Sequence, residues 1–266
     1  MEIEKYFDEG YCIVKNFVST ASAQELHNKI YNYTKWNGNI NEIFTYPDSL
    51  IRFFDPRIYT RHKFKIEGFN LGLYLLIAKN NNKMKVIKKI LNLKKCNRID
   101  SYFSDISNDE IIQWHCDQSF GGATDPGLYF NGNKENISIN GTNKFFLHLT
   151  AVEKGNGAFS YLPRSHIIGI AIRKIINSGK LKYEPFMNLT DAYSIINKNY
   201  QLFINNGLLK KEEIDYFIDN AEKALNNIYD FSLNIDAGGM IIFNDLGFHQ
   251  GTAPSKSQRL VVRYFY

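Results

Sequence analysis

From Ile99 onward the chain is a series of short apolar runs separated by Gly, Asn and Pro. Runs of about four to eight residues bounded by turn residues are typical of β-strands, and their succession is typical of an all-β barrel or jelly roll. The sequence therefore predicts a mainly β fold with flanking helices. The predicted strands are 98–104, 111–117, 144–150, 158–162, 239–243 and 259–266.

Two longer stretches interrupt these strands. Residues 121–143 are rich in Gly and Asn, and we expect a loop over the functional site. Residues 167–227 are helical in pattern, most clearly at 212–227, and a structureless loop of that length would be implausible in a compact domain. We therefore expect a folded helical lid inserted at about 167–230. Without an internal repeat or a low-complexity linker, residues 1–266 are predicted to form a single domain.

The N-terminal part combines a strand with helices. Residues 11–17 alternate between apolar and other side chains and predict a strand. Ser19 or Thr20 is expected to cap a helix that runs to about Tyr33. A further helix is expected at 69–78.

Residues 79–98 concentrate the basic excess of a chain whose formal net charge is +5. Met84, Ile87 and Leu91 fall on one face of a predicted helix, and lysines fall on the other. We interpret this segment as a core helix with a solvated basic face. The alternative is a surface for an acidic partner, a membrane or a polyanionic carrier. No nucleic-acid partner is expected.

The three cysteines are far apart, and none lies in a Cys-x-x-Cys pair. Neither a disulfide framework nor a zinc knuckle is indicated, so a reducing cytoplasm fits best. The first residues have neither the basic nor the apolar region of a signal peptide. Because no apolar run reaches membrane-spanning length, we expect a cytoplasmic protein without a membrane span.

The motif that carries most chemistry is His-x-Asp, in the segment Gln113-Trp114-His115-Cys116-Asp117. Strand alternation puts His115 and Asp117 on one face and turns Trp114 and Cys116 the other way. One short segment can thus supply two metal ligands. The tripeptide alone is weak evidence, and its weight comes from partners downstream.

The partner is His249, which we expect on a turn after the apolar strand 239–243. Two imidazoles and one carboxylate in the order His-x-Asp…His are the ligand set of a non-haem Fe(II) site with positions open for a co-substrate and O₂. Ten residues after His249, Arg259 begins a strand on which Arg263 shares its face. A guanidinium fork matches a carboxylate, so an arginine near iron suggests a dicarboxylate co-substrate.

Four segments in this order extend the pattern over most of the chain: FDEGYCIVKNF, WHCDQ, KFFLHLTAVEKGNGAFSYLPRSH and DAGGMIIFNDLGFHQGTAPSKSQRLVVRYFY. With them the chain resembles the phytanoyl-CoA dioxygenase family of Fe(II)/2-oxoglutarate-dependent oxygenases. The resemblance implies a double-stranded β-helix, or jelly roll. It also implies that His115, Asp117 and His249 bind Fe(II) and carry catalysis, with 2-oxoglutarate and O₂ as co-substrates. Arg259 is then expected to hold the far carboxylate of 2-oxoglutarate.

The chain departs from the family pattern at two places. Where the family usually has Pro-Gly-Ser-His, this chain has Arg164 in place of the glycine, so that Arg164 either points outward or reaches a negatively charged substrate. His166 in the same motif is interpreted as structural. The spacing from His249 to Arg259 is one residue shorter than is common in the family, which leaves Arg263 as an alternative carboxylate anchor.

Further polar residues are candidates for the same site. Gln113, one pleat behind His115, is expected to hydrogen-bond the co-substrate or a metal ligand. His148 is expected to line the pocket and help bind the co-substrate if its strand face points inward. Asn244 and Asp245 are expected to orient the distal histidine, because metal-bound imidazoles usually donate their second N–H to an oxygen.

These patterns predict an Fe(II)- and 2-oxoglutarate-dependent oxygenase that hydroxylates, desaturates or cyclises a C–H bond of a small molecule, in a biosynthetic pathway. Two alternatives stay open: a metal-dependent jelly-roll enzyme that does not use 2-oxoglutarate, and a non-catalytic binding protein on the same scaffold. Abundant aromatic residues and the basic balance favour a polar or anionic substrate, free or bound to a carrier. The patterns fix neither the substrate nor the oligomeric state.

Overall fold

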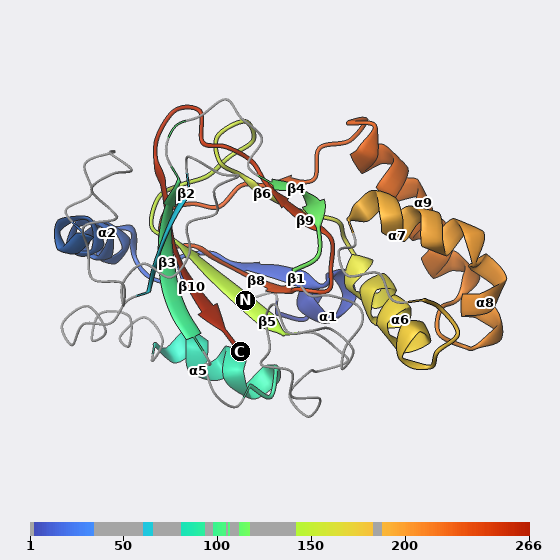
Figure 1. Ribbon diagram of the computed structural model, residues 1–266. Helices are drawn as coiled ribbons and strands as arrows, with labels where there is room; N and C mark the ends of the chain where they lie inside the picture. The colour runs from blue at the N-terminus through green and yellow to red at the C-terminus, as the bar shows by residue number, and fades with distance from the viewer. Residues whose placement is uncertain are drawn as a thin grey trace.

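Two antiparallel sheets lie face to face, with helices on either side of them (Figure 1). The computed structural model describes residues 3–34, 61–65, 81–93, 98–104, 106, 112–117, 142–182 and 188–266. The sheets are built from segments far apart in the sequence. This pairing brings residues near 115 and 249 together.

Within the described residues the larger sheet has six strands, and every pairing in it is antiparallel. It joins the N-terminal strand to the C-terminal half of the chain. Its strands, in spatial order, are β1 (Tyr11–Val14), β8 (Met240–Asn244), β5 (Asn143–His148), β10 (Arg259–Phe265), β3 (Arg98–Ser104) and β2 (Arg61–Lys65).

In the part of the chain that the structure describes, the smaller sheet has four short strands and carries His115 and His249. In spatial order they are β4 (Ile112–His115), β9 (His249–Gly251), β6 (Phe159–Tyr161) and β7 (Ser232–Leu233). The pairing of β4 with β9 is irregular between Ile112 and His115, as at a β-bulge. Such irregularities re-aim side chains and are frequent beside active sites.

The sequence located most of these strands. The strand predicted at 98–104 has the bounds of β3, and the other five predicted strands overlap β4, β5, β6, β8 and β10. The prediction missed β2, β7 and β9. A strand of two or three residues, as in β7 and β9, is too short to leave a period-two pattern.

The N-terminal helices follow the expected signals in part. After α1 (Lys5–Glu9), helix α2 (Thr20–Thr34) begins behind Ser19, whose hydroxyl accepts a hydrogen bond from the Ser22 backbone at 3.1 Å. The basic helix predicted at 79–98 is shorter, and α5 spans Asn82–Ile90. Asn92 takes a left-handed conformation, and the Leu93 amide donates back to the Lys88 carbonyl, which closes the helix. The helix predicted at 69–78 lies outside the described residues.

The described residues of the segment expected to be helical, 167–182 and 188–227, contain four helices at one side of the sheets (Figure 1). They are α6 (Ser165–Asn177), α7 (Leu189–Lys198), α8 (Tyr200–Asn205) and α9 (Lys211–Leu225). Their apolar faces form a core of their own, which also includes Leu246 and Phe248. The helices are therefore packed against the turn that precedes β9.

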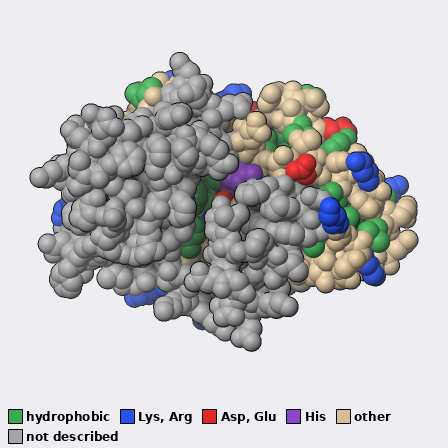
Figure 2. Space-filling model, in the orientation of Figure 1, with side chains coloured by type: hydrophobic (Ala, Val, Ile, Leu, Met, Phe, Trp, Pro, Cys, Tyr) green, Lys and Arg blue, Asp and Glu red, His purple; other side chains and the backbone are tan. Residues whose placement is uncertain are grey.

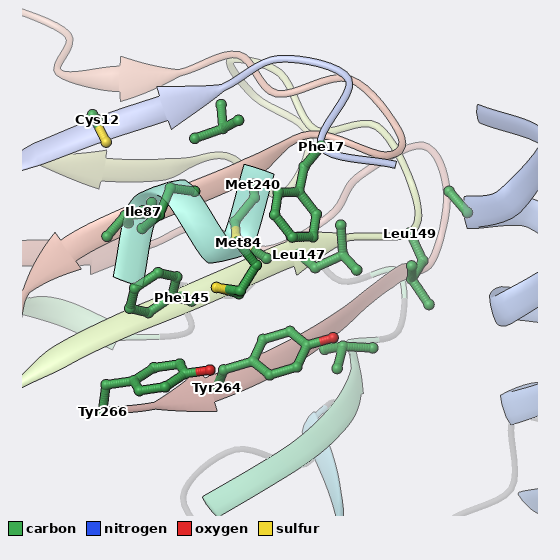
Figure 3. Packing of buried hydrophobic residues seen from close by; sticks show 14 of the residues in the cluster. Cys12, Phe17, Met84, Ile87, Phe145, Leu147, Leu149, Met240, Tyr264 and Tyr266 are labelled. Atoms are coloured by element: carbon green, nitrogen blue, oxygen red, sulfur yellow. The ribbon is translucent and has the colours of Figure 1, made fainter. Parts of the chain in front are cut away.

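Alternation along β5 separates two further cores. Phe145 and Leu147 face Met84 and Ile87 of α5 on the outer side of the larger sheet, as Figure 3 shows. Phe146 points the other way, into a core between the sheets. Phe159 and Phe243 of this inter-sheet core lie beside the His249 ring, with centroids 5.3 and 5.0 Å from its own.

Among the described residues, no helix combines the length and apolar character needed to cross a membrane.

Candidate metal centre

Three side chains expected to act together are neighbours in the structure. His115 is the last residue of β4, Asp117 follows two residues later, and His249 is the first residue of β9, directly opposite His115. The Nε2 atom of His249 lies 3.1 Å from Asp117 Oδ2, and Nε2 of His115 lies 3.6 Å from Asp117 Oδ1. One ligand atom from each residue falls within 4.8 Å of the others, so the three could hold one metal ion.

Both imidazoles are oriented by backbone carbonyls. Nδ1 of His115 lies 2.7 Å from the Gln113 oxygen, and Nδ1 of His249 lies 2.9 Å from the Gly247 oxygen. Donation from Nδ1–H to these carbonyls would leave each Nε2, which lies on the side of the Asp117 carboxylate, available to bind a metal ion shared with that carboxylate. Two such nitrogens and one carboxylate fit the donor set of non-haem iron. The expectation that Asn244 or Asp245 orients His249 is wrong, because the acceptor is the Gly247 carbonyl.

The turn before His249 is tightly enclosed. A Cβ on Gly247 would come within 1.7 Å of the Tyr161 hydroxyl, so only glycine fits there. Tyr161 donates to the Asn244 carbonyl at 3.0 Å, and the Ser165 hydroxyl accepts from the Phe248 amide at 2.8 Å. The Tyr161 ring is nearly parallel to the His249 ring, with centroids 6.4 Å apart. A buried frame therefore fixes the distal histidine.

A lysine that was not predicted reaches the same carboxylate. Nζ of Lys144 lies 2.5 Å from Oδ2 of Asp117 and 4.0 Å from Oδ2 of Asp245. Burial tends to raise the pKa of Asp117, but the Lys144 ammonium, with His249, holds that pKa well below its usual range. Burial raises the pKa of Asp245. Strand alternation could have indicated that Lys144 lies near the site, because Lys144 falls on the same face of the predicted strand as His148.

Arg259 is buried at the start of β10. Its guanidinium donates to the carbonyls of Gly157 and Thr252 and to the hydroxyl of Ser104, the last at 3.1 Å. Arg263, two residues further along the same face, is also buried and has Asp100 as its cross-strand neighbour. The guanidinium of Arg263 lies 5.8 Å from the Phe146 ring centroid.

His148 is almost fully buried on the inter-sheet face, near Arg259. Neither of its ring nitrogens has a hydrogen-bond partner among the described residues. Burial, together with the Arg259 charge, lowers the pKa of His148 to about 3, so that the ring is neutral at physiological pH. A buried imidazole without partners is costly unless a ligand or water completes it.

The remaining candidates lie at the edges of the site. The Gln113 side chain is exposed, and its backbone carbonyl contacts the His115 ring. Arg164 adopts a left-handed conformation at φ 63° before α6, and its guanidinium lies 5.2 Å from the Tyr216 ring centroid. His166 is buried beside Gly10, and burial lowers its pKa to about 4.

The helical segment adjoins the site directly. His115 forms an isolated bridge with Asn188, the N-cap residue of α7, and the Trp114 ring packs edge-on against Phe231 at 6.1 Å. Trp114 and Cys116 contact the helical core, as expected for the face opposite His115. Figure 2 shows histidine side chains reaching the surface beside this segment. Of the three candidate ligands, His115 has a side chain that is 25% exposed.

The family model for phytanoyl-CoA dioxygenase (PhyH) matches residues 6–260 of the chain. The chain belongs to this family. Membership makes it an enzyme of the iron- and 2-oxoglutarate-dependent class. No curated protein matches the chain.

Solved structures of low sequence identity share the fold of this family member. The epimerase SnoN, in complex with Fe³⁺, alpha ketoglutarate and nogalamycin RO, has 10% identity and a TM-score of 0.55, over 98% of this chain and 80% of its own. HygX from Streptomyces hygroscopicus, with nickel and 2-oxoglutarate bound, has 7% identity and a TM-score of 0.54, over 99% and 85%. EctD from S. alaskensis, with bound Fe, has 11% identity and a TM-score of 0.54, over 99% and 74%.

At Arg164, where the chain departs from the family pattern, the backbone keeps the conformation of the turn. The family's usual glycine before the Ser-His pair corresponds to Arg164, and this position has the positive φ that glycine adopts without strain. The turn is therefore kept, and the arginine carries the strain. Its amide still donates to the Glu9 carbonyl at 2.9 Å.

Proposed function

We propose that the chain is an Fe(II)- and 2-oxoglutarate-dependent oxygenase with a jelly-roll core, acting on a C–H bond of a small molecule. The observation that carries this proposal is the convergence of His115, Asp117 and His249, each with its metal-facing atom within 4.8 Å of the others. The chain that carries these three residues belongs to a family of enzymes with this chemistry. Two facing antiparallel sheets support the jelly-roll assignment.

In this proposal Nε2 of His115, Nε2 of His249 and one oxygen of Asp117 hold Fe(II). The carbonyls of Gln113 and Gly247 keep each Nδ1 protonated, so that Nε2 stays available as a ligand. Iron bound with 2-oxoglutarate and O₂ supplies the oxidant that removes hydrogen from the substrate C–H bond. The three protein ligands leave the remaining positions open for these co-substrates.

We assign the far carboxylate of 2-oxoglutarate to Arg259. Its guanidinium is buried on the inter-sheet face, and a charge-assisted bidentate contact there would be strong. His148 lies beside it as a neutral ring with unsatisfied nitrogens, so it can donate one hydrogen bond to the same carboxylate. Gln113 is the weakest of the proposed cofactor contacts, because its side chain is exposed.

The helices from α6 to α9 are proposed to form the lid of a single domain, because they adjoin the metal cluster at Asn188 and Trp114. A lid of this kind excludes water from the reacting bond. The small molecules found bound to SnoN and HygX, nogalamycin RO and hygromycin B, support a small-molecule substrate for this chain too. The presence of Asp117 favours oxygen transfer over halogenation, since related halogenases replace this carboxylate with a small residue to admit chloride.

The test is turnover of 2-oxoglutarate across a panel of small molecules, with purified protein, Fe(II) and ¹⁸O₂ in chloride-rich buffer. The proposal expects succinate in step with a product that carries heavy oxygen or lacks two hydrogens. The His249→Ala variant should give neither. If iron binds but no substrate in a broad panel stimulates succinate formation, a metal enzyme that does not use 2-oxoglutarate becomes the better account. A chlorinated product would contradict the assignment of Asp117.

A further inference from the structure

Lys144 stands out among the residues near the candidate metal centre because neither the sequence motif nor the proposed ligand set accounts for it. It is the second residue of β5, and strand alternation turns it toward the inter-sheet face with Phe146 and His148. Its side chain is 13% exposed. A lysine this well buried requires an anionic partner, since an unpaired buried ammonium is strongly disfavoured.

The partners of Lys144 are two carboxylates with different roles. Asp117 Oδ2 is 2.5 Å from the ammonium, whereas Asp245 Oδ2 is 4.0 Å away. The Asp245 carboxylate is already engaged by the amide and hydroxyl of Thr142. The closer and stronger contact of Lys144 is therefore with the proposed metal ligand.

The backbone reinforces this arrangement. The Asp117 amide donates to the Asp245 carbonyl at 3.0 Å, so the segment after β4 is attached to the end of β8. The Lys144 ammonium also lies 5.5 Å from the centroid of the Phe265 ring, which limits its movement. The Asp117 carboxylate is thus held next to the end of β8, and the Lys144 ammonium extends from β5 and lies beside β10.

We propose that Lys144 is a positioning residue that fixes the rotamer of Asp117 and restricts it to one metal-bound oxygen. This inference rests on the proposed function. A carboxylate that bound iron through both oxygens would occupy one of the positions needed by 2-oxoglutarate or O₂. An ammonium on Oδ2 prevents that, and groups that hydrogen-bond a metal ligand commonly tune affinity by about 10- to 100-fold.

Two other roles for Lys144 predict different effects of its removal on metal affinity. If Lys144 instead competed with the metal for Asp117, its removal would tighten metal binding. If the ion pair served folding alone, its removal would lower stability and leave metal affinity unchanged. Measuring metal affinity and stability on the same variants separates the three roles.

The experiment compares wild-type protein with Lys144→Met, which keeps the length of the side chain and removes its charge, and with Lys144→Arg, which keeps a cationic donor. Lys154→Met is the matched control, because Lys154 forms an exposed ion pair with Asp230 at 2.9 Å. Metal-free protein is titrated anaerobically with Fe(II) by calorimetry. A parallel titration with Co(II) records the visible absorption spectrum, which responds to coordination number and geometry. Thermal unfolding of each metal-free variant shows whether it is folded.

The expected result for Lys144→Met is a Kd for Fe(II) raised by about tenfold or more, with an altered Co(II) spectrum. Lys144→Arg should recover part of the affinity, and Lys154→Met should match wild type. A Lys144→Met variant that binds Fe(II) as tightly as wild type, or more tightly, overturns the inference while leaving the proposed function intact. If wild-type protein takes up no Fe(II), the proposed function fails, and this inference fails with it. Should Lys144→Met not fold, Lys144→Ala, which also removes the charge, is titrated in its place: a raised Kd for Fe(II) in the folded variant supports the inference, and wild-type affinity overturns it.

Discussion

Gly169 in α6 lies directly against the carbonyl oxygen of Leu246, and a Cβ at position 169 would come within 2.2 Å of that oxygen. Leu246 belongs to the turn that carries the Gly247 carbonyl and leads to His249. The helical segment therefore contacts the turn before His249 at a position that admits no side chain. A methyl group there must displace the turn.

We predict that Gly169→Ala lowers the free energy of unfolding by about 1–3 kcal/mol, the usual effect of overpacking. It should also weaken Fe(II) binding, because displacing Leu246 shifts the adjoining Gly247, whose carbonyl orients His249. Gly251→Ala is the control, since no described atom lies within 4 Å of a Cβ built there. Urea unfolding measures the first effect and Fe(II) titration the second. Equal stability of the two variants would contradict this prediction, because it would mean that the turn moves without lowering the free energy of unfolding.

The two arginines of β10 are predicted to differ in function. Losing one partner of a buried charged pair costs on the order of 2–5 kcal/mol. Arg259→Ala should therefore raise the apparent 2-oxoglutarate requirement at least about tenfold. Arg263→Ala should leave that requirement near the wild-type value, and it should act mainly on stability, because Arg263 packs over Phe146 and Phe265. Steady-state kinetics with varied 2-oxoglutarate distinguishes them, and the reverse pattern would make Arg263 the anchor.

His148 is predicted to make stability fall in mild acid. Because burial depresses its pKa to about 3, the unfolded chain binds a proton here near pH 6.5 that the native protein does not bind. The stabilisation is therefore complete above pH 6.5 and is lost as the pH falls toward 3. A single histidine with this shift contributes a loss of about 2 kcal/mol between pH 7 and pH 5.

The measurement is urea unfolding of wild type and His148→Gln at both pH values. The variant should lose less stability between them, by about the same 2 kcal/mol. His166, whose pKa is lowered to about 4, acts in the same direction and remains in both proteins. Identical pH dependence of wild type and variant would mean that His148 is charged or solvated in the native state.

The helical segment is predicted to respond to the assembled active site. Asn188 pairs with His115, and the α6–α9 core contains Phe248 next to His249, so ligands at the centre should stabilise these helices. Hydrogen exchange in residues 188–227 should slow when Fe(II), 2-oxoglutarate and substrate are present. Helix α5, on the outer side of the larger sheet, should not change. Protection confined to the core strands would assign the helices another role, such as an oligomer interface.

Much of this architecture was predictable from the sequence because long elements leave repeated signals. The strand at Arg98–Ser104 and the cap at Ser19 follow from side-chain alternation and local hydrogen bonding. Helix α5 ends before the predicted residue 98 because Asn92 adopts a left-handed conformation. The sequence around Asn92 does not predict that conformation. Strand β9 has three residues, so its pairing with β4 could be known only from the folded chain.

The same contrast holds at the site. The side chains of His115, Asp117 and His249 could be named from their types, order and spacing, whereas the groups that orient them could not. Both histidines are held by main-chain carbonyls, which every residue possesses, so no residue type marks them. Lys144 contacts Asp117 from a strand of the other sheet, and only the tertiary pairing reveals that contact.

The most direct test of the central claim is an anaerobic titration of Fe(II) into metal-free protein with 2-oxoglutarate present, followed by the charge-transfer absorption of the iron complex. The account predicts one iron per chain, absorption that requires both ligands, and its loss in His115→Ala and His249→Ala but not in His27→Ala, a change in α2. Absorption that persists in both site variants, or that never appears in wild type, would contradict the assignment of this centre.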